Sequence, residues 1–270
     1  MTATELHYAQ HGEGVPVLAI HGWTPDHRLM TGCLEPVFAD RPGYLRVYPD
    51  LPGMGASPAP ESVASSDDIL ASLAAFIDAR FGDEPFLLIG ESYGGYLARA
   101  IAGRRRDQVR GLALICPIGR RLRRADRTIP RHQVIAAEPD LLAGVDPQLA
   151  EDFASIAVVH NEQTLRRFRE NIAPGLAVAD HAALQRIALR WELSTEPESS
   201  DPYPHPALIL AGRQDSSTGY ADTYPLLEHY PRASFAILDR AGHNLQDEQR
   251  TLFAALVGEW LDRVAEAELR

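Results

Sequence analysis

A serine between two glycines is the residue in this sequence best suited to covalent chemistry. Ser92 follows the apolar run 85–89 and precedes a small, alanine-rich segment, with Gly90 and Gly94 two residues away on either side. The pattern predicts a strand, a sharp turn and a helix, with the serine at the turn. Such a corner strains the backbone and lifts the hydroxyl clear of the sheet, and the glycines let strand and helix approach closely. Ser92 is therefore the candidate nucleophile.

The sequence also supplies a base and an acid that could activate this serine. Asp215 follows the predicted strand 207–211, and His243 follows the predicted strand 234–238. Because the carboxyl ends of parallel strands meet at one edge of a sheet, we expect both side chains beside Ser92. The histidine would take the hydroxyl proton, and the aspartate would fix its tautomer and stabilise the imidazolium. The order Ser, Asp, His along the chain is the one expected for such a sheet.

Asp239 is a second acid close to His243 in the sequence, but it stands at the end of the strand itself. We therefore assign the acid to Asp215. If His243 is the base, kcat/KM should rise with pH through an apparent pKa of about 6 to 7.5.

Acyl transfer also needs two donors aimed at the developing oxyanion. The backbone N–H of Tyr93, directly after the serine, and that of Trp23, after an early strand, are the candidates. The indole of Trp23 is also expected to line the substrate pocket. His21 precedes this loop, and we expect it to be a buried histidine that bonds loop backbone rather than a catalytic one.

Short apolar runs alternate with helical patterns through most of the chain. This alternation predicts an α/β protein with a mostly parallel sheet covered by helices on both faces. The predicted strands are 6–10, 15–20, 44–48, 85–89, 109–115, 207–211 and 234–238.

The rhythm changes between the fifth and sixth of these strands. Residues 118–205 contain several helix starts and no convincing strand, so we expect a helical lid inserted between 1–117 and 206–270, which together form the core. Its apolar helical faces include Phe153 and Trp191, which are expected to line the pocket.

Composition narrows the range of functions. The net charge is −11, which argues against nucleic acid or an anionic membrane as a partner, and favours a small-molecule substrate. All 26 basic residues are arginine, so a Walker A loop, a Schiff-base lysine and a Ser-Lys dyad are excluded. Neither the two cysteines, Cys33 and Cys116, nor the histidines form a metal-binding pattern, and we expect no metal and no cofactor. The first residues lack the pattern of a signal peptide, and we expect a cytoplasmic protein.

Six arginines crowd the start of the predicted lid, at 120, 121, 123, 124, 127 and 131. The lid also carries enough Asp and Glu to balance them, so we expect a solvated basic face. The alternative is a surface that attracts an anionic substrate.

Five motifs together resemble the α/β-hydrolase superfamily over essentially the whole chain. They are His21-Gly22-Trp23, the segments 50–57, 90–95 and 212–215, and Gly242-His243. The resemblance implies a hydrolase that needs no cofactor. Ser92 replaces the aspartate nucleophile of dehalogenase-like and epoxide-hydrolase-like members, which disfavours those activities, and the segment after His21 is closer to esterase-like and haloperoxidase-like members.

The leading hypothesis is a serine hydrolase that cleaves small carboxylic esters through an acyl-enzyme on Ser92. Within the enzyme class, the alternatives are a lactonase, a thioesterase, or a hydrolase of carbon–carbon bonds in vinylogous diketones. From another class comes a ligand receptor that keeps the fold without turnover. Turnover of an ester would separate the receptor from the enzymes.

Overall fold

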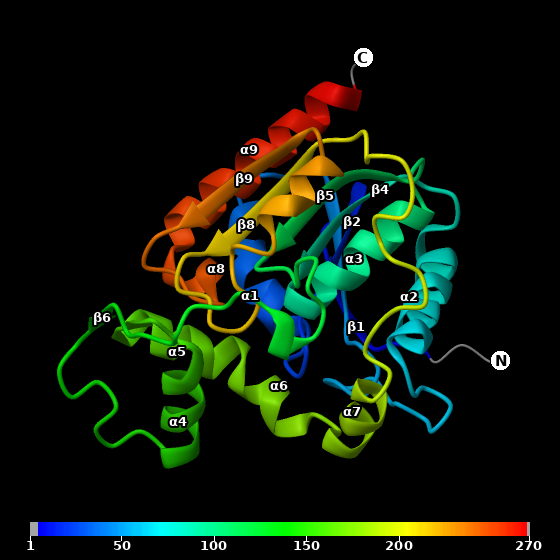
Figure 1. The fold of residues 1–270 in the computed structure, drawn as a ribbon. Helices are drawn as coiled ribbons and strands as arrows, with labels where there is room; N and C mark the ends of the chain where they lie inside the picture. The colour runs from blue at the N-terminus through cyan, green and yellow to red at the C-terminus, as the bar shows by residue number, and fades with distance from the viewer. Residues whose placement is uncertain (1–4, 269–270) are drawn as a thin grey trace.

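A seven-stranded sheet forms the centre of the molecule in this computed structural model, which describes residues 5–268 (Figure 1). The strand order is β1-β3-β2-β4-β5-β8-β9, and β1 alone among them runs antiparallel to its neighbour. The strands are β1 (Tyr8–His11), β2 (Val15–Ile20), β3 (Tyr44–Pro49), β4 (Phe86–Glu91), β5 (Val109–Ile115), β8 (Ala207–Gly212) and β9 (Ala233–Leu238). The predicted α/β architecture with a mostly parallel sheet is confirmed.

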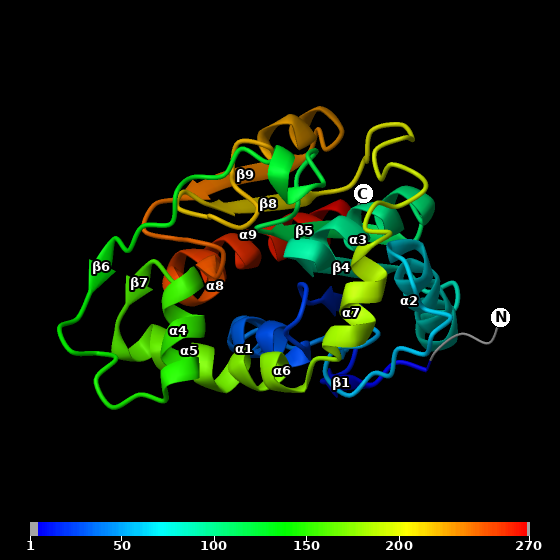
Figure 2. The same ribbon diagram turned by 60° about the horizontal axis from the view of Figure 1, so that its bottom comes forward.

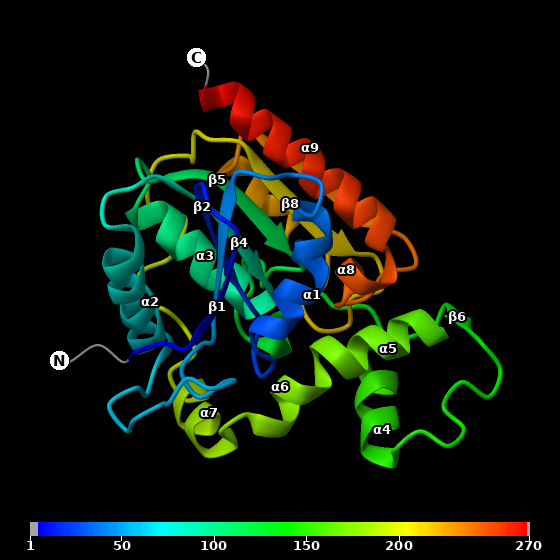
Figure 3. The same cartoon turned by 180° about the vertical axis from the view of Figure 1, so that it is seen from behind.

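Helices cover both faces of this sheet. On one face lie α2 (Ser66–Phe81) and α3 (Ser92–Arg104), and on the other lie α1 (His27–Phe38) and α9 (Arg250–Glu268), which come to the front in Figure 3. Adjacent residues of β4 point to opposite faces, as the pleat of a strand requires. Leu88 packs into the core under α2 and α3, whereas Leu87 and Ile89 pack into the core under α1 and α9. The two cores together fix β4 at the centre of the sheet.

The segment between β5 and β8 lies beyond the carboxyl ends of the strands (Figure 1). Its helices are α4 (Pro147–Ile156), α5 (Glu162–Asn171), α6 (Ala173–Val178) and α7 (His181–Ala188), which come forward in Figure 2. The helix α5 contacts α1 and α8 (Leu245–Glu248), so this block is attached to the main body. Shorter 3-10 helices occur at η1 (Arg124–Asp126) and η2 (Tyr224–Glu228).

Two expectations for this segment are wrong in detail. It contains two short strands, β6 (Ala136–Ala137) and β7 (Val159–His160), which pair in parallel with each other. Each has two residues, which is too short for a sequence period to reveal. Trp191 lies beyond the end of α7 rather than on its face. No helix in the described part of the chain is long and apolar enough to cross a membrane.

Candidate active site

Ser92 lies at the sharp corner where β4 ends and α3 begins. Its φ angle is +53°, in the left-handed region that a side chain other than glycine adopts only under strain. A Cβ on Gly94 would lie 2.4 Å from the carbonyl oxygens of Ile20 and His21, and a Cβ on Gly90 would lie 2.5 Å from the carbonyl oxygen of Gly94. Glycine at both positions therefore lets α3 pack against β2 and β4 closely enough to hold the corner.

The structure brings His243 and Asp215 to this serine. His243 Nε2 lies 2.9 Å from Ser92 Oγ, and His243 Nδ1 lies 2.9 Å from Asp215 Oδ2. The aspartate stands on the loop after β8, and the histidine stands on the loop after β9, as the parallel sheet predicts. Asp239, the rival acid, is exposed. The three side chains form one hydrogen-bonded chain that ends at the serine hydroxyl.

Asp215 is held as a carboxylate by its surroundings. Its Oδ1 accepts hydrogen bonds from the N–H groups of Ser217 and Thr218, at 2.8 and 3.0 Å. Its Oδ2 also accepts the hydroxyl of Thr218 at 2.7 Å. Burial by itself raises the pKa of Asp215, but the His243 charge and these hydrogen bonds outweigh it and hold that pKa well below its usual range. The carboxylate therefore remains charged and fixes the His243 ring.

The pKa of His243 lies higher than the sequence suggests. Burial by itself lowers it, but the charge and hydrogen bond of Asp215, followed by the charge of Glu91, raise the pKa of His243 to about 9. The expected value of about 6 to 7.5 assumes an imidazole close to its ordinary pKa. The structure corrects that expectation because two carboxylates face the same ring.

Glu91 is the residue of this site that sequence reasoning missed. Its Oε1 lies 3.4 Å from His243 Nε2, and the residue is 1% exposed. Burial raises the pKa of Glu91 to about 7, against the opposing effect of the His243 charge. The sequence did contain a signal, because an acidic residue ends an otherwise apolar run. The sequence does not show, however, that the Glu91 side chain points toward His243.

Trp23 and Tyr93, whose N–H groups are expected to bind an oxyanion, both lie near Ser92 in the fold. Tyr93 is the second residue of α3, so its N–H has no acceptor within the helix. Trp23 lies on the loop after β2, where the following residue, Thr24, has a φ of +91°. The rings of Trp23 and Tyr93 lie 5.0 Å apart, and a Cβ built on Gly22 would lie 3.1 Å from the Cβ of Ser92, so the loop after β2 passes beside the serine.

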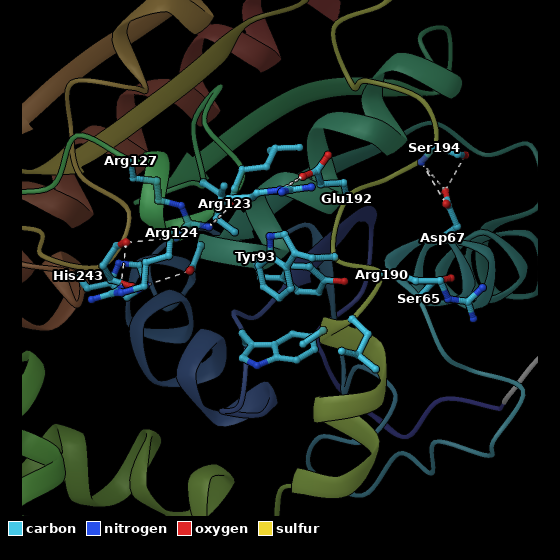
Figure 4. Close-up of a pocket in the computed structure, with 18 of the residues that line it drawn as sticks. Ser65, Asp67, Tyr93, Arg123, Arg124, Arg127, Arg190, Glu192, Ser194 and His243 are labelled. Atoms are coloured by element: carbon cyan, nitrogen blue, oxygen red, sulfur yellow. Dashed lines mark hydrogen bonds and ion pairs between the residues drawn. The ribbon is translucent and has the colours of Figure 1, made fainter.

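A cavity of about 1040 Å³ opens from Ser92 and His243 (Figure 4). Three aromatic rings form part of its wall, because Trp191 lies 4.9 Å from Trp23 and 4.7 Å from Tyr93. The hydroxyl of Ser66 donates to the Trp191 carbonyl at 2.6 Å and fixes this part of the chain. Both tryptophans therefore line the cavity at Ser92, although Trp191 does so from beyond the end of α7.

A second cavity of about 230 Å³ also contains Ser92 and His243 in its wall. Part of its wall is apolar and comes from α1 and from the segment between β5 and β8, with Leu29, Ile156, Phe168, Ile172 and Leu176. Polar side chains complete the wall, among them the acids Glu91 and Asp152. The serine hydroxyl therefore stands between a large cavity and a small one.

Phe153 does not line either cavity, contrary to expectation. It is 1% exposed and packs against Phe168 and His160, at ring distances of 5.6 and 4.8 Å. The α5 helix covers Phe153, whereas Ile156, one turn later at the end of α4, lines both cavities.

The arginine-rich segment is solvent-exposed as expected at five of its six arginines, and Arg127 is half-buried, but part of the segment also faces the site. Arg123, Arg124 and Arg127 line the larger cavity, together with Arg190 from the chain after α7. The segment folds back over the loop that follows β8, where Arg127 Nη1 donates to the Ser217 carbonyl at 3.2 Å. No local sequence pattern predicts this contact, because Arg127 and Ser217 are 90 residues apart in the chain.

His21 adopts the structural role expected for it. It is fully buried, its Nδ1 lies 2.8 Å from the Gly22 carbonyl, and its Nε2 accepts the N–H of Leu51 at 3.0 Å. Burial lowers the pKa of this imidazole, so the neutral form binds the two loops together.

Two groups of described residues hold three potential metal-ligand atoms close together. They are His7, His27 and Asp50, and Cys116, Asp215 and His243. In the first group, the imidazoles of His7 and His27 hydrogen-bond the carboxylate of Asp50 at 2.7 and 2.8 Å. The same carboxylate accepts the N–H groups of His27 and Ala56, so its oxygens already have four donors. These side chains join the residue before β1, the start of α1 and the loop after β3.

A mostly parallel sheet with a serine at a strained strand–helix corner, facing a histidine and an aspartate, is the arrangement of hydrolases built on an α/β fold. The model of the alpha/beta hydrolase family matches residues 17–256. The chain belongs to this family and is an enzyme of hydrolase type.

Relatives and a solved structure cover nearly the whole chain. The chain is 27% identical to a 2-hydroxymuconate semialdehyde hydrolase of Pseudomonas sp. strain CF600, over 96% of this chain and 90% of that protein. It is 30% identical to a pimeloyl-acyl-carrier protein methyl ester esterase of Aeromonas hydrophila, over 86% of this chain and 89% of that protein. The crystal structure of an alpha/beta superfamily hydrolase from Oenococcus oeni PSU-1 is similar with a TM-score of 0.90 and 32% identity, over 96% of both chains. These relatives support an enzyme over a receptor without turnover.

Proposed function

We propose that this protein hydrolyses small carboxylic esters through an acyl-enzyme on Ser92. The observation that carries the proposal is the hydrogen-bonded chain from Asp215 through His243 to the Ser92 hydroxyl, with 2.9 Å at both links from the imidazole. A nucleophile within hydrogen-bond reach of a base, which is itself oriented by a third group, is the geometry that activates a hydroxyl.

The reaction then proceeds in two balanced halves. Ser92 Oγ bonds to the ester carbonyl carbon while its proton passes to His243 Nε2, and collapse of the tetrahedral intermediate expels the alcohol, which takes that proton. Water next attacks the acyl-enzyme and gives a proton to His243. The second collapse returns the proton to Ser92 Oγ and releases the carboxylic acid. No group other than water and the ester is consumed.

Besides the nucleophile and the base, the reaction needs donors that bind the oxyanion and a pocket that excludes water. The N–H groups of Tyr93 and Trp23 are proposed to bind the oxyanion, where each donor removed from such a site commonly costs about 10²- to 10³-fold in rate. The helices α4 to α7 act in this proposal as a lid that excludes water and shapes the pocket. Support for the lid comes from Ile156 and Trp191, which reach from that segment into the cavities at Ser92.

Carbon–carbon bond hydrolysis is the second candidate. It is favoured by the similarity, along 96% of this chain, to a hydrolase of 2-hydroxymuconate semialdehyde. The methyl ester esterase among the relatives favours the ester reaction instead. Both reactions use the same serine, so the geometry at Ser92 serves either substrate.

A substrate panel tests the proposal. Turnover is measured with methyl and nitrophenyl esters of rising acyl length, with lactones, thioesters and a vinylogous diketone beside them, and with Ser92→Ala as the paired control. We expect the highest kcat/KM on an ester and its loss in Ser92→Ala with folding retained. A higher kcat/KM on the diketone assigns the protein to carbon–carbon bond hydrolysis, and a Ser92→Ala variant that keeps near wild-type ester turnover refutes the nucleophile.

A further inference from the structure

We propose that Arg124 and Arg127 form an anion subsite in the larger cavity, and that the substrate is an ester that carries a carboxylate at the far end of its acyl chain. The inference rests on the proposed ester hydrolysis and adds the substrate class. Of the two sequence expectations for this segment, a solvated face and a surface that attracts an anionic substrate, the inference takes the second for Arg124, which is exposed, and for Arg127, which is half-buried.

The two guanidiniums differ from their neighbours in what neutralises them. Arg120, Arg121 and Arg123 each lie within salt-bridge distance of an acid, namely Glu228 at 3.3 Å, Asp222 at 3.5 Å and Glu192 at 2.6 Å. Among the residues that the structure describes, no carboxylate lies within 4.0 Å of the guanidinium of Arg124 or of Arg127. Arg131 likewise has no ion pair among the described residues, but of these three unpaired arginines only Arg124 and Arg127 line the larger cavity.

The contacts of these two side chains hold them in place beside each other. Arg124 donates to the carbonyls of Ser216 and Ser217 at 3.2 and 3.4 Å. Arg127 donates to the same Ser217 carbonyl at 3.2 Å and to the Leu122 carbonyl at 2.6 Å. Fixed guanidinium groups bind a carboxylate with less loss of side-chain entropy than free ones.

A bound anion would relieve a cost that the site carries without one. Arg127 is only partly exposed, and burial, followed by the positive charge of Arg124, lowers the pKa of its guanidinium. Two like charges held close together attract an anion, and the bond from an arginine fork to a carboxylate is short and charge-assisted.

The subsite opens into the same cavity as the serine. Ser92, His243, Arg124 and Arg127 all line the larger cavity. Figure 4 shows Arg124 and Arg127 on the side where His243 lies, whereas Arg190, Asp67 and Ser194 lie on the opposite side. Arg190 is less available, because an acid, Asp68, lies 3.9 Å from it.

The other residues that line the larger cavity determine which acyl chain can connect the carboxylate to the ester group. Ile118, Leu122 and Trp191 line the same cavity, so a short alkyl chain is suited to this space. The alcohol group would then occupy the small cavity of about 230 Å³ at Ser92, whose volume favours a methyl or other small ester. The geometry points to the small-alcohol half-ester of a dicarboxylic acid.

Two esters of equal acyl length provide the test. Methyl pentanoate and monomethyl glutarate both have five acyl carbons, and differ in the terminal carboxylate. Hydrolysis is followed by acid release at constant pH for the wild type, Arg124→Gln, Arg124→Gln/Arg127→Gln and, as a control, Arg131→Gln. Arg131 is an exposed arginine of the same segment that lines neither cavity at Ser92, so it matches the loss of charge.

We expect the wild type to prefer monomethyl glutarate in kcat/KM. In Arg124→Gln, kcat/KM for monomethyl glutarate should fall at least tenfold, as expected for hydrogen bonds to a charged group, and kcat/KM for methyl pentanoate should stay within twofold of wild type. The Arg127 charge also lowers the pKa of His243, so the double variant is judged by the ratio of the two esters, which should fall ten- to hundredfold. Arg131→Gln should change neither, and retained methyl pentanoate turnover shows that the variants fold. No preference for the half-ester, or an equal loss on both esters, overturns the inference.

A binding measurement that needs no turnover separates this inference from the proposed function. Glutarate binding to the wild type is measured by calorimetry, with neutral glutaramide and inorganic phosphate as further probes. We expect the wild type to bind glutarate and not glutaramide. The Arg124→Gln variant should bind glutarate at least tenfold more weakly than the wild type. If neither ester is hydrolysed but this pattern holds, the ester function fails and the subsite stands. Phosphate binding equal to glutarate binding overturns the carboxylate assignment.

Discussion

Replacement of Glu91 by glutamine should move the pH profile of the enzyme to lower pH. The wild-type kcat/KM is expected to rise as His243 loses its proton, through a pKa of about 9. A charged Glu91 stabilises the imidazolium and thereby raises that pKa. Because Glu91→Gln keeps the shape of the side chain and removes its charge, neutral imidazole should appear at lower pH.

The size of the effect follows from one distance. Unit charges 3.4 Å apart, the separation of Glu91 Oε1 and His243 Nε2, interact by about 1 kcal/mol in water and about 5 kcal/mol at an effective dielectric constant of about 20. One pKa unit corresponds to about 1.4 kcal/mol. Even the aqueous value lowers the midpoint by about one pH unit, because Glu91, with a pKa of about 7, is mostly charged at the pH of the wild-type midpoint.

The assay is kcat/KM between pH 6 and 10 with a neutral nitrophenyl ester. Glu84→Gln is the matched control, because Glu84 is exposed and precedes β4 at the end opposite Glu91, about 20 Å away by the rise of a strand. We expect the Glu84→Gln midpoint to match that of wild type. An unchanged or raised midpoint in Glu91→Gln would refute the role given to this carboxylate.

Three further substitutions test separate parts of the site. Asp215→Asn should lower kcat/KM by a factor on the order of 10⁴ in steady-state ester hydrolysis, because the wrong His243 tautomer is favoured; a loss below tenfold would point to another acid. Phe153→Ala should lower the free energy of unfolding by about 3 to 5 kcal/mol in urea titrations and leave acyl preference unaltered, and the reverse pattern would contradict its burial. Trp191→Ala should shift the optimum of a nitrophenyl ester series to longer acyl chains, since it removes one ring of the cavity wall; an unchanged optimum would exclude the ring from substrate contact.

The corner that presents Ser92 could be predicted because its causes are local. Glycines two residues away on either side, an apolar run before and a helical segment after it define the backbone by themselves. The positions of Asp215 and His243 followed from one further rule, that the ends of parallel strands meet at one edge. These inferences needed no knowledge of side-chain directions.

The remaining features depend on packing between distant segments. The approach of Glu91 to His243 depends on how the loop after β9 returns to β4, and the placement of Arg124 depends on where the segment after β5 crosses the loop after β8. Periodicity did identify an apolar face on α4, but Phe153 packs against α5 while Ile156 reaches the cavity. A helical period gives the spacing of such residues and leaves the partner of each undetermined.

The most direct test of the central claim is covalent labelling of Ser92 with an alkyl fluorophosphonate, which transfers its phosphonyl group to an activated serine with loss of fluoride. Intact mass and peptide mapping are measured at each degree of inactivation. We predict complete loss of ester turnover at one label per chain, with the label on Ser92, and no labelling of Ser92→Ala. Inactivation with the label on another residue, or Ser92→Ala that keeps wild-type turnover, would contradict the account.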